Sequence, residues 1–254
     1  MDSFYQDYML NNNSNSNFPS SYFTEMDKYQ NYFWFKYRLD LVTYFLSHQI
    51  YDYTLEIGCG NGNNLAHLKS KLNLGEIYAS DIFEESLSQC KSLQVNLLRM
   101  DCLDIPFESY FDLAIMLDVL EHIPEDSLAL EQVNKSLTKK GRLLLTVPQH
   151  QSLWSKHDEL NCHVRRYGKK DLEKKLDQAG FHIIKSTSFV SLLLPALFAS
   201  RLFKPVKESP FEDMSISSSL NNILYRICSI EMKMIKKFNL PWGSSRLVLC
   251  EKRS

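Results

Sequence analysis

A glycine-rich stretch is the residue pattern with the clearest chemical meaning in this 254-residue sequence. Gly58-Cys59-Gly60-Asn61-Gly62 directly follows a short apolar run at 54–57, and Glu56 lies inside that run. The three glycines permit a tight turn and let the backbone approach a ligand where a Cβ atom would clash. An unpaired carboxylate is costly to bury, so Glu56 favours a ligand that carries an ammonium or sulfonium charge.

A second carboxylate, Asp81, follows the last glycine by 81 − 62 = 19 residues and ends the next apolar run. At that point a carboxylate can bind both hydroxyls of a ribose, although Asp81 could instead be the N-cap of the following helix. The third glycine comes one residue earlier than in the dinucleotide pattern, and Glu56 would repel a pyrophosphate. The spacing therefore disfavours a dehydrogenase, which remains an alternative.

Apolar runs and helical patterns alternate over most of the chain, which indicates strands joined by helical crossovers. Seven strands are predicted, at 54–57, 77–80, 95–100, 111–117, 142–147, 181–188 and 246–252. The fold class predicted is α/β, with a doubly wound, mostly parallel seven-stranded sheet, a C-terminal antiparallel strand pair and a helical cap insertion.

Composition changes along the chain predict its organisation. We expect a flexible Asn/Ser-rich arm at 1–23, an aromatic N-terminal helix at 24–50, a core at 51–190 and 244–254, and a helical cap insertion at 191–243. A net charge of −1 argues against binding of duplex nucleic acid. The six cysteines stand apart without a CxxC pair. The sequence shows neither an apolar signal segment nor a membrane-spanning segment, so we expect a cytoplasmic protein.

These motifs resemble those of class I S-adenosylmethionine-dependent methyltransferases, over about residues 34 to 252. The resemblance is carried by Glu56 to Gly62, by Asp81, by the pair Asp101-Cys102 and by Leu117-Asp118-Val119-Leu120-Glu121-His122-Ile123-Pro124. The last stretch is similar to the branch that methylates small molecules in ubiquinone and menaquinone biosynthesis. The resemblance implies a Rossmann-like core and S-adenosyl-L-methionine as the cofactor.

The resemblance also implies the cofactor contacts. The backbone from Gly58 to Gly62 would line the methionine part, Asp81 would bind the ribose, and Ile82 would pack on the adenine. Asp101 would accept a hydrogen bond from the adenine amino group, and the backbone N–H of Cys102 would donate one.

Three further residues complete the implied cofactor site. Leu117 and Asp118 would lie beneath the cofactor. Arg38, at 58 − 38 = 20 residues before the first glycine, would lie near the cofactor carboxylate, or else is a solvated helix charge.

Two histidines are the candidates for catalysis. The sulfonium is already activated, so positioning dominates methyl transfer, and a hydroxyl acceptor gains from a general base. His122 follows the fourth core strand and His163 lies in Asn161-Cys162-His163-Val164-Arg165-Arg166-Tyr167, a motif resembling a loop that faces the acceptor in related enzymes. Either histidine could instead be structural.

No metal is expected, because no recognised ligand spacing is present. Two looser groupings contain potential metal ligands: Asp118 with Glu121 and His122, at i, i+3 and i+4, and His157 with Cys162 and His163.

The apolar segment at 189–204 bears on the acceptor. It could make weak contact with a membrane surface or lipid, or form a lid helix that packs on a helix at 216–238. A lid would roof the pocket with apolar side chains. We therefore expect methyl transfer by in-line SN2 displacement to a small apolar or aromatic acceptor, most readily at oxygen. The alternatives are a protein or RNA methyltransferase and a non-catalytic S-adenosylmethionine-binding partner subunit.

Overall fold

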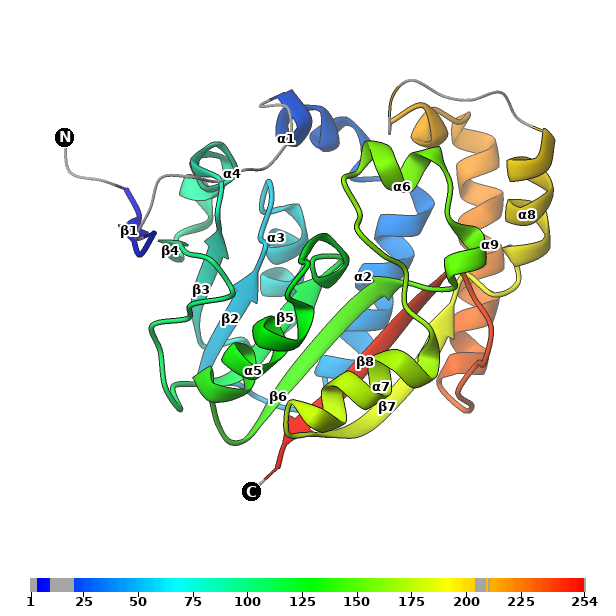
Figure 1. Cartoon of the computed structure of the whole chain (residues 1–254). Coiled ribbons are helices and arrows are strands. Elements are labelled where there is room, and N and C mark those ends of the chain that lie inside the picture. Colours follow the sequence, from blue (N-terminus) through cyan, green and yellow to red (C-terminus); the bar gives the residue numbers. More distant parts are fainter. Residues whose placement is uncertain (1–3, 10–20, 204–208, 210, 254) are drawn as a thin grey trace.

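One mixed sheet forms the centre of the computed structural model, which describes residues 4–9, 21–203, 209 and 211–253. The strand order is β1-β4-β3-β2-β5-β6-β8-β7, and only β8 runs antiparallel to both of its neighbours (Figure 1). The strands are β1 (Gln6–Asp7), β2 (Tyr53–Ile57), β3 (Glu76–Asp81), β4 (Asn96–Arg99), β5 (Phe111–Leu117), β6 (Leu137–Pro148), β7 (Phe181–Phe189) and β8 (Ser245–Lys252).

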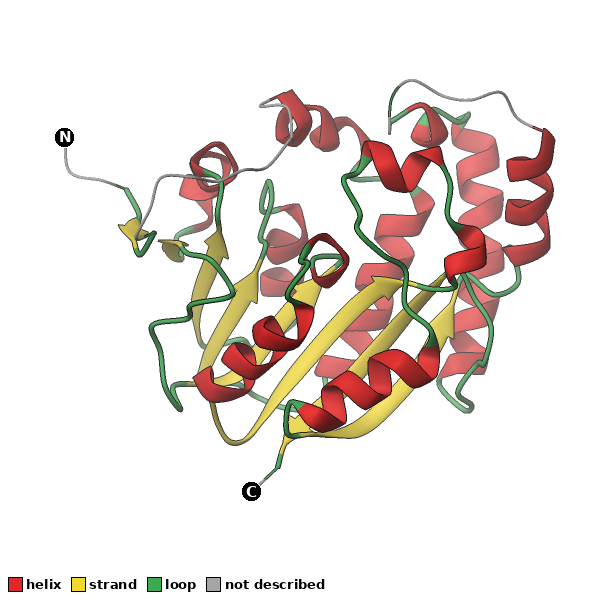
Figure 2. Ribbon diagram, viewed as in Figure 1, coloured by secondary structure: helices red, strands yellow, loops and turns green. Residues whose placement is uncertain are grey.

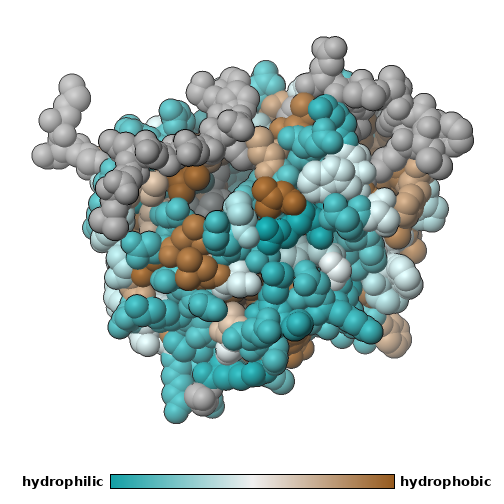
Figure 3. All heavy atoms as spheres, viewed as in Figure 1, coloured by the Kyte–Doolittle hydropathy of each residue, from teal (hydrophilic) through white to brown (hydrophobic). Residues whose placement is uncertain are grey.

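Helices cover both faces of this sheet (Figure 2). Within the described residues they are α1 (Ser21–Met26), α2 (Phe33–Leu46), α3 (Asn63–Lys71), α4 (Glu84–Gln89), α5 (Asp126–Ser136), α6 (Lys156–Leu160), α7 (Lys169–Gln178), α8 (Leu194–Phe203) and α9 (Ser218–Ile235). The surface over α7 is largely hydrophilic, as its lysine-rich sequence requires (Figure 3).

The central strands are apolar on both sides, because each side faces a helical layer. Along β5, Leu113 and Ile115 belong to the core shared with α2, α3 and α9, whereas Ala114 and Met116 belong to the core shared with α5 and α7. Unbroken apolar runs of this kind are typical of buried parallel strands. Burial of both faces therefore explains the unbroken apolar runs from which these strands were predicted.

The sheet has one strand more than the seven predicted. β1 pairs in parallel with β4 through Gln6 opposite Leu98 and Asp7 opposite Arg99, and the side chain of Asp7 lies 3.2 Å from Arg99. Two exposed polar residues carry no strand periodicity, so the sequence offered no signal for this pairing. The Asn/Ser-rich run at 11–17 lies outside the described residues.

The insertion between β7 and β8 contains α8 and α9. Ser217 is the N-cap of α9 and accepts a hydrogen bond from the Leu220 N–H, and the helix packs along α2. None of the helices that the structure describes is both long and apolar enough to cross a membrane. Contact of 189–204 with a membrane surface stays a prediction.

A buried carboxylate joins α9 to the rest of the molecule. Glu231 is 1% exposed, accepts a hydrogen bond from the Tyr37 hydroxyl at 2.8 Å, and accepts two more from the backbone N–H groups of Ser191 and Leu192. The apolar periodicity of the helix gave no indication of this residue, because Glu231 bonds to groups from two distant segments.

Replacing this carboxylate tests its contribution to stability. Glu231→Ala leaves a buried hydroxyl and two N–H groups without their acceptor, so we expect the free energy of unfolding to fall by at least about 2 kcal/mol. Glu131→Ala, at an exposed position of α5, is the matched control and should stay within about 0.5 kcal/mol. Chemical denaturation measures both, and equal values for the two variants would contradict the assigned role.

Candidate active site

The polar residues of the site lie where the parallel strands end. The chain runs from β2 through β3 to β4 on one side and continues from β5 to β6 on the other, so β2 and β5 form the switch point of the sheet. Open α/β sheets bind ligands in the crevice at the carboxyl ends of the strands at such a point. The loops after β2, β3, β4 and β5 all contribute to one cavity here.

The glycine loop connects β2 to α3 with backbone angles that favour glycine. Gly58 and Gly62 have φ angles of +70° and +78°, and a Cβ atom on Gly58 would lie 2.5 Å from a methyl group of Val119. Around Gly60, by contrast, nothing lies within 4 Å of the Cβ position. The loop is therefore packed tightly against the β5 loop on one side and leaves open space on the other.

Asp81 closes the glycine loop from the end of β3. Its carboxylate accepts hydrogen bonds from the Gly60 N–H at 2.9 Å, the Ser86 hydroxyl at 2.8 Å and the Phe83 N–H at 3.1 Å. Burial raises the pKa of Asp81, and these hydrogen bonds oppose that effect. The N-cap of α4 is Phe83, so the alternative assignment of Asp81 as that N-cap was wrong.

Arg38 and Asp118 form an ion pair across the cavity wall. Arg38 is 3% exposed, donates to the Asp118 carboxylate, and donates to the Asn64 side chain at 2.8 Å. Asp118 also accepts from the Thr146 hydroxyl at 3.0 Å and has a φ of +56°. The alternative that Arg38 is a solvated helix charge was therefore wrong.

Glu56 lies beneath the glycine loop. Its side chain is 1% exposed, and neither carboxylate oxygen has a hydrogen-bond partner among the described residues. Burial, opposed by Arg38 and reinforced by Asp81, raises the pKa of Glu56 to about 8. A cation bound near this carboxylate would lower its pKa and favour its charged form.

The cavity brings together most of the residues singled out in the sequence. It has a volume of about 1380 Å³. Its lining includes Arg38, Gly58, Cys59, Gly60, Asp81, Ile82, Asp101, Cys102, Leu117, Asp118, His122 and His163. Glu56 and Gly62 lie just behind this lining and do not form part of it.

His163 is held by a carboxylate that the sequence analysis did not single out. Its Nδ1 atom lies 3.0 Å from Asp158, which also accepts from Arg166 Nε at 2.7 Å and from the Ser155 N–H at 2.9 Å. Although burial opposes it, the hydrogen bond from His163 and the charge of Arg166 lower the pKa of Asp158. An ionised Asp158 fixes a proton on Nδ1 and leaves Nε2 as an acceptor.

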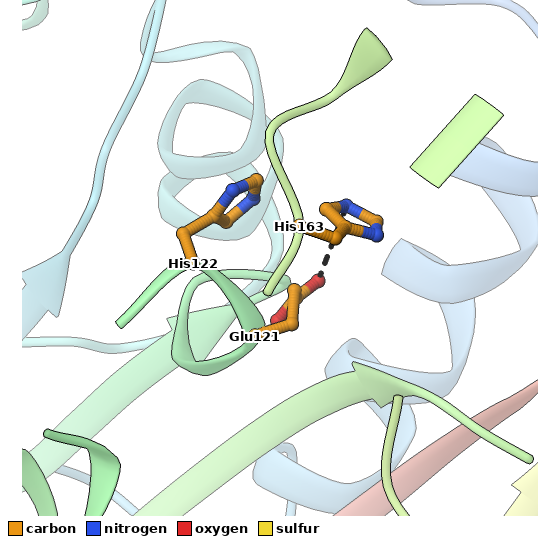
Figure 4. Close-up of side chains that lie close together, drawn as sticks. All are labelled: Glu121, His122 and His163. Atoms are coloured by element: carbon orange, nitrogen blue, oxygen red, sulfur yellow. Dashed lines mark ion pairs between the residues drawn. The ribbon is translucent and has the colours of Figure 1, made fainter. Parts of the chain in front are cut away.

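Glu121 and His122 come from a 3-10 helix after β5 and face His163 (Figure 4). The His122 and His163 rings are 4.8 Å apart, and His163 Nε2 lies 4.0 Å from Glu121. Burial, followed by the charge of His163, lowers the pKa of His122 to about 3, so that ring is neutral at physiological pH.

One ligand atom from each of Glu121, His122 and His163 lies within 4.8 Å of the others, the arrangement of a small metal-ligating group. It differs from both groupings that the sequence suggests. Asp118 is bonded to Arg38 and Thr146 instead, and His163, which is distant in sequence, lies with Glu121 and His122.

The N-terminal helices roof the cavity with aromatic side chains. Tyr22 and Phe23 of α1 line it, and the Tyr22 hydroxyl donates to Asn161 at 2.8 Å. Tyr29 stacks on Phe211 of the insertion, with ring centroids 5.5 Å apart. From the other side, α8 and the region of α9 contribute Leu193, Ala196, Leu197, Ile216, Leu220 and Leu224.

Part of the chain matches the model of a known protein family. Residues 55–145 match the model of the family described as a methyltransferase domain (Methyltransf_11). The match begins in β2 and ends in β6, and so contains the glycine loop, Asp81, Asp101, Asp118 and His122. No curated protein matches the chain.

Solved structures share the fold at low sequence identity. A putative methyltransferase from Haloferax volcanii, solved with the Trm112 methyltransferase activator, gives a TM-score of 0.63 at 14% identity over 92% of this chain and 94% of that chain. A SAM-dependent methyltransferase from Archaeoglobus fulgidus gives 0.58 at 18% identity over 91% and 99%. Phosphoethanolamine N-methyltransferase 2 from Haemonchus contortus gives 0.63 at 14% identity over 97% and 61%.

Domain match, fold and cavity agree with one another. The matched domain covers the parallel strands whose carboxyl ends line the cavity, and the sheet has the predicted C-terminal antiparallel strands. Residues 55–145 therefore match a methyltransferase domain, and the chain has the fold of the solved S-adenosylmethionine-dependent methyltransferases.

Proposed function

We propose that the protein transfers a methyl group from S-adenosylmethionine to an oxygen atom of a small apolar or aromatic acceptor. The observation that carries this proposal is the single cavity of about 1380 Å³ that joins the glycine loop to the His163–Asp158 pair. When bound, the cofactor supplies a sulfonium-activated methyl group. The chain has to bind it, orient the acceptor and exclude water.

The residues near the glycine loop suit this cofactor. The open space beside Gly60 admits a ligand against the backbone, and the buried, unpartnered carboxylate of Glu56 favours positive charge above it. We assign the ribose hydroxyls to Asp81, the adenine to Ile82, Asp101 and Cys102, and the methionine part to the loop, Arg38, Leu117 and Asp118. This assignment rests on the resemblance and on the shared cavity.

The acceptor side of the cavity supports the proposed acceptor class. Aromatic rings from α1 and α2 and apolar side chains from α8 and α9 form its walls. His163 can take the proton from an acceptor hydroxyl at Nε2, because Asp158 holds the other ring nitrogen. His122 is neutral and stands beside that ring, where it can accept or donate a hydrogen bond to the same hydroxyl.

A protein or RNA acceptor is less well supported. The roof formed by α1 and the insertion leaves a cavity suited to a small molecule, and the net charge of −1 is unfavourable for RNA phosphates. The likeness to the Trm112-bound enzyme is one of fold.

Removing the Asp81 carboxylate tests the cofactor site. We expect Asp81→Ala to weaken S-adenosylhomocysteine binding at least tenfold, because the ribose loses its acceptor and Gly60 loses its hydrogen-bond partner. Calorimetric titration measures the affinity, and Asp171→Ala, at an exposed position of α7, is the control. An unchanged affinity in Asp81→Ala would remove the basis for this site.

Glu56 predicts a pH dependence of cofactor binding. Its pKa of about 8 is raised above the ordinary value, and a bound ammonium group should lower it. Binding between pH 6 and 8 should then release a proton from Glu56, so affinity for S-adenosylhomocysteine rises with pH and levels off above about 8. Calorimetry in buffers of different ionisation enthalpy counts the proton, and Glu56→Gln should abolish its release. Equal proton release in both proteins would refute this role.

His163 is expected to act in the methyl-transfer step. With a phenolic acceptor that is turned over, His163→Gln should lower kcat by about 10²–10⁴-fold and leave S-adenosylhomocysteine affinity within a factor of two. His182→Gln, on the exposed side of β7, should leave both unchanged. A kcat loss that disappears at high pH would support general-base action, whereas full activity of His163→Gln at all pH values would exclude it.

A further inference from the structure

Glu121 is buried in the cavity wall, where its charge faces His163 Nε2 at 4.0 Å. Its side chain is 0% exposed, and within the described residues neither of its carboxylate oxygens has a hydrogen-bond partner. It lines the same cavity as His163 and points toward that ring (Figure 4). Leaving a carboxylate in this state is costly, so a partner is expected to come from a ligand.

The cationic side chains around the cavity are already engaged elsewhere. Arg38 bonds to Asp118 and Asn64, and Arg166 bonds to Asp158 and to the Gln149 carbonyl. Two lysines also line the cavity. Lys156 pairs with Glu159 at 2.9 Å, and Lys36 lies over the Tyr225 ring at 4.1 Å.

The charged groups around Glu121 do not give its carboxylate a hydrogen bond. Burial and then the like charge of Asp118, at the end of β5, raise the pKa of Glu121, and the charges of Arg38 and Arg166 oppose this rise. His163 Nε2, from the loop after β6, is 4.0 Å away and beyond hydrogen-bond distance. Tyr22, from α1, lines the same cavity, and burial followed by the charges of Cys162, Asp118 and Glu121 raises the pKa of its phenol.

We propose that Glu121 binds a basic nitrogen of the acceptor, so that the acceptor is an amine-bearing compound rather than a neutral one. This inference rests on the proposed function and narrows its substrate class. An amine supplies both the hydrogen-bond donors and the positive charge that a buried carboxylate requires. The aromatic rings of the roof add favourable surroundings for a cation.

The geometry also limits where that nitrogen stands in the acceptor. Because His163 Nε2 and Glu121 are 4.0 Å apart, one ligand can reach both only if its hydroxyl and its nitrogen are separated by a few bonds. The acceptor is then a phenol or alcohol with an amino group close to the methylated oxygen.

The test compares three ligands that share a phenol ring and differ in charge. Titration of the protein saturated with S-adenosylhomocysteine, in the presence of EDTA, gives affinities for 2-(aminomethyl)phenol, 2-ethylphenol and salicylate. We expect the cationic ligand to bind at least tenfold more tightly than its neutral isostere, and salicylate to bind most weakly. A wild-type protein that does not prefer the amine would overturn the proposal.

Variants assign the preference to one residue. In Glu121→Gln, which keeps the shape of the side chain, the preference for the amine should fall to within twofold, and Glu121→Met should behave alike. Glu125→Gln, at an exposed position of the same loop, should retain the full preference. Retention of the preference in both Glu121 variants would overturn the assignment.

A cofactor role of Glu121 gives a different result. If its partner were the sulfonium, Glu121→Gln would weaken S-adenosylmethionine relative to S-adenosylhomocysteine and leave the amine preference intact, which would refute the inference. Failure of the wild-type protein to bind S-adenosylhomocysteine would instead refute the proposed function itself. The two failures are therefore separable.

Discussion

The ion pair between Arg38 and Asp118 connects four elements around the cavity. Arg38 projects from α2 and also bonds to Asn64 of α3, while Asp118 follows β5 and also accepts from Thr146 of β6. Both side chains are largely withdrawn from water, so each needs the other to offset its desolvation. The left-handed backbone of Asp118, at a φ of +56°, is sustained by these contacts and turns the chain toward Glu121 and His122.

A second network holds the loop that carries His163. Asp126 accepts from the Tyr167 hydroxyl at 2.8 Å and from Lys175 at 3.0 Å, and it pairs with Arg165 at 2.5 Å. The Val164 N–H donates to the Glu121 carbonyl at 2.9 Å. The loops after β5 and β6 are thus bonded to each other directly, which keeps His163 opposite Glu121.

Local patterns were sufficient to predict the parallel strands β2 to β6, the glycine loop and Asp81, because these depend on the chain's own periodicity and on backbone angles. The partners of the charged residues depend on which loops meet. Asp158 stands five residues before His163, a spacing with no regular meaning, and its role follows only from the turn that brings it back to the ring. Arg38 and Glu121 likewise acquire their significance from burial, which a single sequence does not report.

The short β1 strand has a consequence for how the molecule meets other chains. Without it, β4 would be the outer strand of the parallel end of the sheet, and its backbone N–H and C=O groups would face solvent. β1 covers Leu98 and Arg99, the Tyr8 N–H bonds to the Arg99 carbonyl at 2.8 Å, and Asp7 brings a charge to this edge. Uncovered edges recruit strands from other molecules, and charged, very short edge strands discourage such pairing. The first residues of the described chain therefore protect the protein against edge-to-edge aggregation.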